Sequence, residues 1–447
     1  MGDIALANKI ATAVGEYGGT VYFVGGCVRD ELLGRPCKDI DIEVHGISPE
    51  TLEAILSRFG TLISMGKSFG VFGIKGYTLD IAMPRKETVL GRGHKDFAVT
   101  VDANIGTRKA AKRRDFTVNA LMKNVLTGEI IDHFGGLQDL KKGILRHVDD
   151  NSFPEDPLRV LRAASLAARL NFTIAKETLT LCSTMDLSAL SKERVAEEMK
   201  KALLSAPRPS LFFAFLREMR QLDHWFTELE TLIELEQNPI YHSEGDVWNH
   251  TMLVLDRAAT YRDRAKYPYA FMLSALVHDL GKSVTTEFTG GAFHAYGHET
   301  EGLPLVTSFI RRLTNEKSLL SYALNMTELH MRPGIAARNN SSHKSTNRLF
   351  DRSVCPEDLI LLSLADKEGS ESEQSTDTAP FLQERLQYFH TTMQAPFVTG
   401  KDLLDAGLTP DTHFSKLLEY AHKLRLAGIP KESALKQTLA YHRTLKG

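Results

Sequence analysis

The chain has 447 residues, 25% charged and 43% hydrophobic, a composition typical of soluble globular proteins and a length that predicts about two to four domains. The formal net charge of -2 excludes a global positive field, so any nucleic-acid binding must come from local basic patches. The four cysteines include no CxxC pair, which argues against a zinc knuckle or a disulfide framework. With no signal-peptide pattern and no apolar run of membrane-spanning length, the sequence predicts a cytoplasmic protein.

The N-terminal part of the chain predicts a mixed α/β domain. Strand-like patterns occupy residues 20–26, 38–44 and 69–83. The last of these predicts a hairpin that turns near Gly76. Residues 48–60 predict a helix, because Ser48 suits the N-cap and Pro49 suits the first helical position.

The remainder of the chain predicts helices. Residues 154–240 show helical periodicity without strand alternation, and residues 245–366 continue it with embedded histidines. A polar run at 369–380 is typical of a linker and precedes a helical tail. We therefore predict an α+β protein in four parts: residues 1–140, 141–240, 241–368 and 369–447.

A pair of aspartates lies within the second predicted strand. Asp39 and Asp41 project to the same side of an extended chain, about 6–7 Å apart at Cα. Such carboxylates hold the divalent cations of phosphoryl and nucleotidyl transfer, and Asp80 on a neighbouring predicted strand is a candidate third ligand. Taken alone, an Asp-x-Asp pattern is more often the solvent-facing side of an edge strand.

The preceding turn favours the catalytic interpretation. Gly25 and Gly26 link a strand to a helix, where backbone amides can approach a phosphate, and Arg29 can reach a triphosphate. A double glycine alone is usually a plain turn. Its combination with Arg29 and the aspartate pair is far more specific.

Two further motifs suggest nucleotide contacts. In "RRDFTVNAL" we expect Asp115 and Asn119 on one helix face, able to bind a ribose, with Arg114 near phosphate; a solvated basic face is the alternative. In "EDPLRVLRA" we expect Asp156 as N-cap, with Arg159 on the same face. Asp156 can accept from the amino group of adenine or cytosine while Arg159 donates to the ring nitrogen, a pattern that guanine and uracil lack. A surface salt bridge is the alternative.

The motif order resembles a known family. "GGCVRD…KDIDIEV", "RRDFTVNA", "DHFGGLQDL", "EDPLRVLRA" and "SKERVAEEMKKAL" resemble the class II tRNA nucleotidyltransferases, which comprise CCA-adding enzymes and related bacterial poly(A) polymerases. The match spans roughly residues 20–205, and "VTGKDLLDAGLTP" resembles a C-terminal signature that here lacks its usual Pro-Gly-Pro. The resemblance implies a polymerase-β-like head followed by an all-α neck, body and tail.

The resemblance also implies roles for individual residues. Asp39 and Asp41 would bind Mg²⁺ and catalyse attack of the tRNA 3′-hydroxyl on the α-phosphate of CTP or ATP. Residues implied to bind the nucleotide are Gly25, Gly26, Arg29, Arg114, Asp115, Asn119, Glu155, Asp156, Arg159 and Arg162. Asp132, Gly135 and Gly136 match a hinge, and Arg194 matches a motif that steadies the neck.

Histidines form a second constellation. His278-Asp279 follows an apolar helix, and His250 and Asp366 lie on other predicted helices with apolar neighbours. A buried His-Asp pair with nothing to bind carries a desolvation cost, which a shared metal would resolve. With "HDLGK" intact, the pattern resembles the HD phosphohydrolase superfamily. It implies His250, His278, Asp279 and Asp366 as ligands of a transition metal such as Ni²⁺ or Mn²⁺, with His298 and His330 completing a second metal site.

Several functions remain open. Full CCA addition is favoured, with hydrolysis of phosphate esters, such as repair of damaged tRNA 3′ ends, as an accessory activity. The segment 81–112 resembles the family's flexible loop and lacks the shortening of CC-adding members, which disfavours a CC-only enzyme. The nearest rival is an A-adding enzyme that completes CC-ended tRNA. "HDLGK" argues against a poly(A) polymerase. The intact Asp39 and Asp41 argue against a phosphohydrolase whose head only binds RNA, and both acidic clusters argue against a non-catalytic scaffold. The expected partners are tRNA, CTP and ATP, with no membrane; the sequence does not give the oligomeric state.

Overall fold

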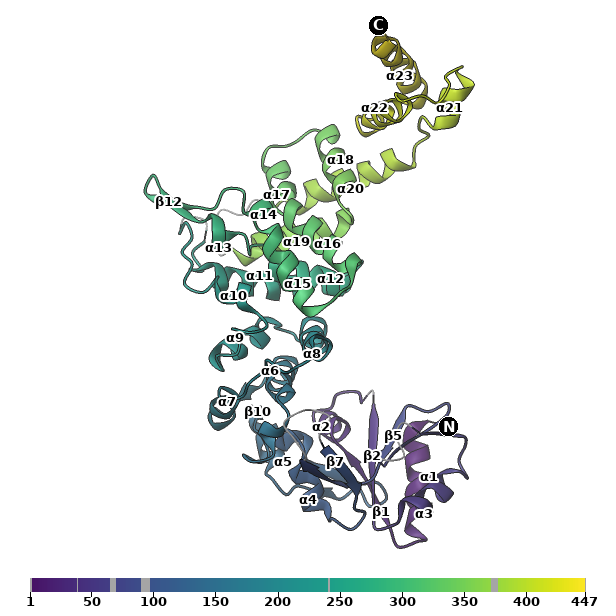
Figure 1. Ribbon diagram of the computed structural model, residues 1–447, viewed down its shortest axis with the longest axis vertical. Helices are drawn as coiled ribbons and strands as arrows, with labels where there is room; N and C mark the ends of the chain where they lie inside the picture. The colour runs from purple at the N-terminus through teal and green to yellow at the C-terminus, as the bar shows by residue number, and fades with distance from the viewer. Residues whose placement is uncertain are drawn as a thin grey trace. The chain divides into compact units, whose positions relative to one another are not determined.

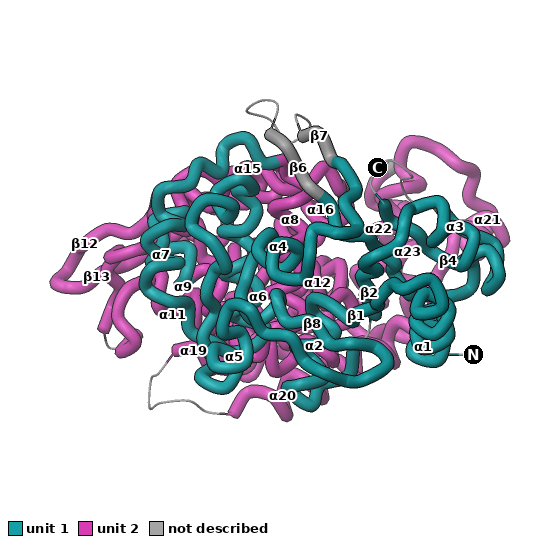
Figure 2. Tube along the Cα trace, turned by 90° about the horizontal axis from the view of Figure 1, so that it is seen from below, with its two compact units in different colours: residues 1–190, 214–221 teal, residues 191–213, 222–447 magenta. Residues whose placement is uncertain are grey.

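The structure is a computed structural model that describes residues 2–37, 39–64, 70–89, 97–239, 242–370 and 377–446 (Figure 1). The chain divides into two compact units. Unit 1 comprises residues 1–190 and 214–221, and unit 2 comprises residues 191–213 and 222–447 (Figure 2). Unit 1 contains the large sheet, whereas unit 2 is mostly helical, and together they confirm the α+β class.

The sheet of unit 1 has seven strands in the order β3-β4-β5-β2-β1-β8-β9. Their bounds are Thr20–Val24 (β1), Ile40–His45 (β2), Leu62–Ser64 (β3), Val71–Ile74 (β4), Leu79–Ala82 (β5), Met122–Asn124 (β8) and Ile130–Ile131 (β9). The strands pair antiparallel except β2 and β5, which run parallel, so the sheet is mixed as predicted. The predicted hairpin is β4-β5, and Gly76 in its turn has a φ of 92° that favours glycine.

Helices accompany this sheet, and the sequence predicts where one of them begins. The bounds are Asp3–Gly15 (α1), Gly26–Leu32 (α2), Pro49–Leu56 (α3) and Thr107–Lys112 (α4). The side chain of Ser48 accepts a hydrogen bond from the Thr51 amide at 3.2 Å, which confirms Ser48 as the N-cap of α3. A separate antiparallel pair, β6 (Arg85–Val89) and β7 (Phe97–Val101), lies in the predicted flexible loop, whose residues 90–96 are outside the described part.

Helices dominate the rest of unit 1. They are α5 (Gly136–Lys142), α6 (Leu158–Leu170), α7 (Lys176–Cys182) and part of α9 (Ser210–Glu218), with short 3₁₀ turns η2 (Thr117–Asn119) and η3 (Phe153–Glu155). The prediction of no strand after residue 154 is wrong at β11 (Thr173–Ile174), which pairs in parallel with β10 (Ile144–Leu145). Two residues are too few to produce a visible alternation.

Unit 2 is built around an apolar helix. Its helices before the linker are α8 (Lys192–Ser205), α10 (Thr227–Glu230), α11 (Val247–Tyr261), α12 (Pro268–Val277), α13 (Lys282–Thr285), α14 (His298–Glu301), α15 (Leu303–Leu313), α16 (Lys317–Leu329), α17 (Met331–Arg338), α18 (His343–Arg352) and α19 (Pro356–Gly369). Every residue of α12 from Phe271 to Val277 is buried, because the helix packs against α8, α11, α16 and α19. This packing brings the ends of several helices together.

One element of unit 2 contradicts the all-helical prediction for residues 245–366. Residues Glu287–Thr289 (β12) and Ala292–His294 (β13) form an antiparallel hairpin. Its turn is Gly290-Gly291, and both residues have positive φ values, of 62° and 86°. A two-residue Gly-Gly loop is a hairpin signal, and the strands are simply too short to show periodicity.

The C-terminal helices form a small core of their own. They are α20 (Ala379–Gln394), α21 (Gly400–Asp405), α22 (Phe414–Leu426) and α23 (Lys431–Lys446). Val398, Leu403, Leu417 and Ala434 are buried together between the last three. Across the described ranges, no helix is both long enough and apolar enough to cross a bilayer.

Candidate functional site

The predicted catalytic aspartates meet on two neighbouring strands. The parallel pairing of β2 and β5 places Asp41 opposite Asp80, so both side chains lie on one face at adjacent strand positions about 4.8 Å apart. Asp39 is exposed immediately before β2. The pKa of Asp41 is raised by burial and by the negative charges of Asp80 and Asp39, although Arg114 opposes the shift. Clustered carboxylates of this kind are hard oxygen ligands, and they fit Mg²⁺.

The backbone of the double-glycine turn lies close to Asp41. Gly25 has φ 71° and ψ -139°, a conformation that L side chains rarely adopt. A Cβ atom there would lie 3.3 Å from Arg114 Nη1 and 3.5 Å from Asp41 Oδ2. Glycine at this position therefore lets the strand-to-helix backbone approach the carboxylates and the arginine closely.

Arg29 lies on the helix that follows this turn and forms hydrogen bonds next to the site. The residue is 7% exposed, and its guanidinium donates to Asp30 Oδ1 and Oδ2 at 2.8 and 2.9 Å and to Asn119 Oδ1 at 2.6 Å. These contacts tie α2 to the turn η2. Asp30 is a partner that the sequence reasoning missed, although it is the residue next to Arg29. Contact between Arg29 and a triphosphate stays a prediction.

Asp115 and Asn119 meet, but not on a helix as predicted. The helix α4 ends at Lys112, and residues 117–119 form a 3₁₀ turn. The cause is Phe116, which is fully buried 5.8 Å from the Phe153 ring and pairs with His147 in an extended bridge. The tighter turn still lets Asn119 Nδ2 donate to Asp115 Oδ1 at 3.0 Å.

Asp115 is the buried centre of this network. It accepts hydrogen bonds from the Phe116 amide at 2.8 Å and from Arg162 Nε and Nη2 at 2.8 and 2.5 Å. Burial disfavours its charge, yet the Arg162 guanidinium and the Asn119 amide together hold its pKa below the usual value. An ionised carboxylate is therefore fixed between α6 and the η2 turn.

The predicted base-reading residues lie at the start of α6. The helix begins at Leu158, with Pro157 rather than Asp156 at the N-cap, so the prediction was one residue early. Asp156 Oδ1 nevertheless accepts from the Leu158 amide at 3.0 Å, in the manner of an Asx turn. Glu155 is exposed in the preceding 3₁₀ turn.

Backbone carbonyls fix the Arg159 side chain. Its Nη1 donates to Ser152 O at 2.5 Å and its Nη2 donates to Arg113 O at 3.1 Å. The guanidinium also lies over the Phe153 ring, 5.8 Å from its centroid. Since Arg113 adjoins Arg114, this contact joins the start of α6 to the segment that borders the aspartates.

Glycine also permits the contact that supports the η2 turn. A Cβ on Gly136, the first residue of α5, would lie 2.3 Å from the Thr117 carbonyl oxygen. Asp132 caps this helix end by accepting from the Gly136 and Leu137 amides at 2.9 Å. The predicted hinge residues thus form a tight, capped junction against η2; whether it moves stays a prediction.

A second cluster lies in unit 2, where the ends of several helices converge. It comprises His250 on α11, His278 and Asp279 after α12, His298 at the start of α14, His330 after α16 and Asp366 on α19. The side chains of all but Asp366 are almost completely buried. The structure therefore brings together every residue that the sequence assigned to the HD constellation.

Asp279 is shared between two groups of imidazoles. Its Oδ2 lies 3.3 Å from His278 Nε2 and 3.5 Å from His250 Nε2. Its Oδ1 lies 3.2 Å from His298 Nε2 and 3.7 Å from His330 Nε2. Asp366 Oδ1 closes the first group, 3.1 Å from His250 Nε2. Two three-residue groups that share Asp279 could each hold an ion.

The outer hydrogen bonds fix the tautomers of these rings. The Nδ1 atoms of His278, His298 and His330 donate to the carbonyl oxygens three residues earlier, at 2.9, 2.8 and 2.7 Å. A carbonyl only accepts, so each Nδ1 carries a proton, and whenever a ring is neutral its Nε2 is the unprotonated nitrogen and faces inward. Inward lone pairs of this kind are what a metal requires.

Two observations show that the cluster fits a cation. His278 Nε2 is buried without a well-aligned hydrogen bond, although the Asp279 carboxylate lies 3.3 Å away. Burial disfavours a charged His278, yet Asp279 and Asp366 outweigh it and raise the pKa of His278 to about 10. The carboxylates thus demand positive charge, which a proton or a metal ion can supply. The four imidazoles favour a transition metal over Mg²⁺.

Sequence reasoning missed two residues around this cluster. Glu244 Oε1 accepts from Nδ1 of both His242 and His250, at 2.8 and 2.9 Å, and so orients His250. Lys282 Nζ lies 2.8 Å from Asp279 Oδ2. Lys282 stands in the "HDLGK" motif and could have been found there, whereas no pattern marks Glu244 in its loop.

Paired glycines bring the two halves of the cluster together. A Cβ on Gly281 would lie 2.0 Å from the His298 carbonyl oxygen, and one on Gly302 would lie 2.8 Å from Gly281 Cα. The turn after Asp279 therefore touches both ends of α14. This contact sets the position of His298 relative to Asp279.

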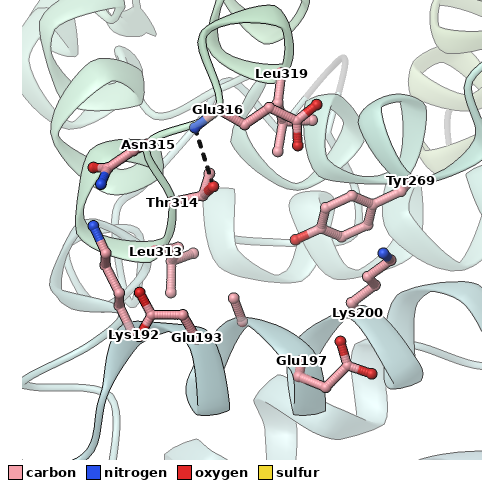
Figure 3. A pocket seen from close by; sticks show the side chains of 11 residues that line it. Lys192, Glu193, Glu197, Lys200, Tyr269, Leu313, Thr314, Asn315, Glu316 and Leu319 are labelled. Carbon is pink, nitrogen blue, oxygen red and sulfur yellow. Dashed lines mark hydrogen bonds between the residues drawn. The ribbon is translucent and has the colours of Figure 1, made fainter.

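Unit 2 also has an open pocket of about 390 Å³ between α8, α12 and the loop before α16 (Figure 3). Charges of both signs line it, including Lys192, Glu197, Lys200 and Glu316. The Lys200 ammonium lies 5.4 Å from the centroid of the Tyr269 ring. None of the predicted site residues lines this pocket.

Comparison with known proteins places this geometry in a family. Residues 21–146 match the poly A polymerase head domain, and residues 171–233 match the probable RNA- and SrmB-binding site of polymerase A. The multifunctional CCA protein of Nitrosococcus oceani is 36% identical over 402 residues, covering 87% of this chain and 93% of the relative. The multifunctional CCA protein of Pseudoalteromonas atlantica is 37% identical over 362 residues, which cover 78% of this chain and 85% of the relative.

Solved structures agree on the fold. The Thermotoga maritima CCA-adding enzyme complexed with tRNA has a TM-score of 0.66 at 22% identity, covering 98% of this chain and 95% of that one. The Bacillus stearothermophilus CCA-adding enzyme in complex with CTP has a TM-score of 0.68 at 21% identity, and the match covers 100% of this chain and 99% of that one. Together with the identity and coverage of its bacterial relatives, these findings show that the chain belongs to the class II tRNA nucleotidyltransferases, among the CCA-adding enzymes.

Proposed function

We propose that this chain adds C, C and A to the 3′ end of tRNA from CTP and ATP. The observation that carries the proposal is the head site. Asp41 and Asp80 lie opposite each other on paired strands, and the backbone of Gly25 lies close to Asp41. The hydrogen bond from Arg159 to the Arg113 carbonyl connects this site to the helix start that we propose reads the base. The chain's relatives are named multifunctional CCA proteins, and three of the structural neighbours are complexes with tRNA, ATP and CTP. We assign transfer to residues 1–140, nucleotide selection and RNA binding to 141–240, hydrolysis to 241–368 and a helical tail to 369–447.

In this proposal Asp39, Asp41 and Asp80 hold Mg²⁺. The metal supplies positive charge for attack of the tRNA 3′-hydroxyl on the α-phosphorus, with pyrophosphate leaving. Gly25 and Gly26 admit the triphosphate next to the carboxylates, and Arg114 adds positive charge there. The Asp115–Asn119 pair lies at the ribose, and Arg162 keeps Asp115 ionised.

Base selection rests on two side chains held by the backbone. Asp156 accepts from the Leu158 amide through Oδ1, which holds its carboxylate at the helix start, and that carboxylate would accept from the amino group of cytosine or adenine. Arg159 is anchored on Ser152 O and Arg113 O, with donors left for the ring nitrogen. Glu155 beside them completes the motif. Guanine and uracil would place a carbonyl against the Asp156 carboxylate, where both groups are acceptors. They would also place a ring N–H against Arg159, where both groups are donors.

Single-turnover extension of three tRNA transcripts tests this function. The transcripts end at the discriminator base, in C, or in CC, and each is incubated with Mg²⁺ and CTP, ATP or both. We expect the bare transcript to gain three nucleotides. Extension of only the CC-ended transcript, by one A, would instead identify an A-adding enzyme and overturn full CCA addition.

Asp156→Asn is expected to relax nucleotide selection. The amide oxygen can still accept from the Leu158 amide, while the new NH₂ group is a donor that can pair with the carbonyl of uracil or guanine. We expect discrimination of CTP and ATP against UTP and GTP to fall by about 10- to 100-fold. The measurement is kcat/KM for each of the four nucleotides. Unchanged ratios would remove Asp156 from base reading; exposed Glu129→Gln is the matched control.

We further propose that the unit 2 cluster is a metal-dependent phosphohydrolase centre. His250, His278, Asp279 and Asp366 would hold one transition metal ion such as Ni²⁺ or Mn²⁺, and His298 and His330 with Asp279 would hold a second. The metal would supply Lewis acidity toward a phosphate ester. The chain's own residues fix the imidazole rings through their Nδ1 hydrogen bonds, so that each Nε2 would become a ligand when a bound metal displaces its proton. Phosphate esters at damaged RNA 3′ ends are the proposed substrates.

A further inference from the structure

The hairpin β12-β13 and the residues that follow it carry exposed aromatic side chains. The hairpin lies in the segment between Asp279 and His298, near α13 and α14, in Figure 1. Phe288 is 62% exposed and Tyr296, just after the hairpin, is 82% exposed. Phe288 and Phe293 pack edge to face across the strands with centroids 4.9 Å apart, which stiffens the hairpin.

Tyr296 forms a flat surface with its neighbour. The rings of His294 and Tyr296 are stacked, with centroids 5.1 Å apart and planes only 9° from parallel. The exposure of Tyr296 means that this stack has a ring face open to solvent. Exposed, near-parallel aromatic rings are the surfaces on which proteins stack nucleobases, because every base has a π-face.

The backbone connects this stack directly to a proposed metal ligand. The carbonyl oxygen of Ala295 accepts the hydrogen bond from His298 Nδ1 at 2.8 Å, and Tyr296 follows in the same peptide unit. Two peptide steps separate the Cα atoms of Tyr296 and His298, so these atoms are at most about 7.6 Å apart. Gly297, with a φ of 77°, makes the bend into α14 between them. The backbone that carries Tyr296 therefore lies next to that of a proposed metal ligand.

We propose that Tyr296 and His294 form a stacking platform for the base of a terminal ribonucleotide whose phosphate ester lies at the histidine cluster. This inference rests on the proposed phosphohydrolase function and deepens it. The platform holds the base, and the cluster receives the phosphate. A substrate without a base would gain nothing from these rings.

Fluorescence binding tests the platform without relying on hydrolysis. The probes are 2-aminopurine riboside 3′-monophosphate and a trinucleotide that ends in the same group, because stacking quenches 2-aminopurine. We expect the full chain to quench both probes, and Tyr296→Ala to weaken binding between about 5- and 100-fold. Tyr296→Phe keeps a ring and should retain binding. Tyr17→Ala, at an exposed aromatic residue of unit 1, should change nothing. Quenching of the trinucleotide alone would identify RNA ends, rather than free nucleotides, as the source of the ligand.

Steady-state hydrolysis separates this proposal from the phosphohydrolase assignment. Tyr296→Ala should raise KM for a 3′-nucleotide with little change in kcat, and should leave glycerol phosphate hydrolysis unchanged. Equal loss on both substrates, or no change in quenching or KM, overturns the platform. If the wild-type chain hydrolyses neither substrate but Tyr296→Ala still abolishes quenching, the phosphohydrolase fails while the base platform stands.

Discussion

Replacing Asp39 and Asp41 together with alanine is expected to reduce nucleotide incorporation by at least about 1,000-fold, because no cation would then be held at the α-phosphate. The fold should tolerate the change. Burial and the charges of Asp80 and Asp39 raise the pKa of Asp41, so its ionised form is disfavoured in the folded chain. Removing these charges relieves repulsion, and we expect Tm to stay the same or rise.

Two quantities are measured for each variant: single-turnover incorporation of CTP into a tRNA transcript, and the Tm of thermal unfolding. Glu129→Gln, an exposed carboxylate in the same sheet-bearing unit, serves as the matched control. Hydrolysis by the unit 2 cluster should be unaffected by either change. Incorporation that persists in the double variant would show that these aspartates are not catalytic, and a large fall in Tm would show that they are structural.

The strand pattern predicted much of this head site. Alternation placed Asp39 and Asp41 on one side of a strand, and the glycine pair predicted the β1-to-α2 turn that the structure confirms. The pattern of alternating residues did not predict that Asp41 lies directly opposite Asp80. Register depends on which strands pair, and β5 reaches β2 by a parallel pairing that local periodicity cannot encode.

The errors have local physical causes. The predicted helix through Asp115 and Asn119 gave way because burial of Phe116 requires an extended residue there. Tertiary packing overrode the local pattern, yet the two side chains still met through the 3₁₀ turn. The Asp156 prediction erred by one residue, because Pro157 rather than Asp156 occupies the N-cap.

The histidine cluster illustrates a different limit. The motif and its outlying residues named all the side chains that converge, but not how they share Asp279. The two carboxylate oxygens face different imidazole groups because Gly281 and Gly302 let α14 pack against the turn. Such a backbone contact follows from the packed fold rather than from any periodicity.

Asp279→Asn is the change expected to have the largest effect on unit 2. Each oxygen of Asp279 faces two imidazoles, and an amide NH₂ in place of one oxygen cannot ligate a metal. We expect phosphohydrolase activity to fall by at least about 1,000-fold and bound transition metal to be lost. CCA addition should be unchanged. Activity on a 3′-nucleotide and metal content are the measurements, with His442→Ala, at a histidine outside the cluster, as control.

Thermal unfolding distinguishes a metal centre from a buried ion-pair network. An ion that binds only the folded chain stabilises it in proportion to the logarithm of its concentration, so Tm of the wild-type chain should rise with Mn²⁺ or Ni²⁺ and fall with a chelator. The response should weaken at lower pH, because a proton on His278, whose pKa the carboxylates raise, competes with the metal. A network closed by Lys282 and protonated His278 predicts the reverse: no response to metal in the wild type, and a large loss of Tm in Asp279→Asn. Only a metal-dependent Tm that Asp279→Asn abolishes agrees with the proposed centre.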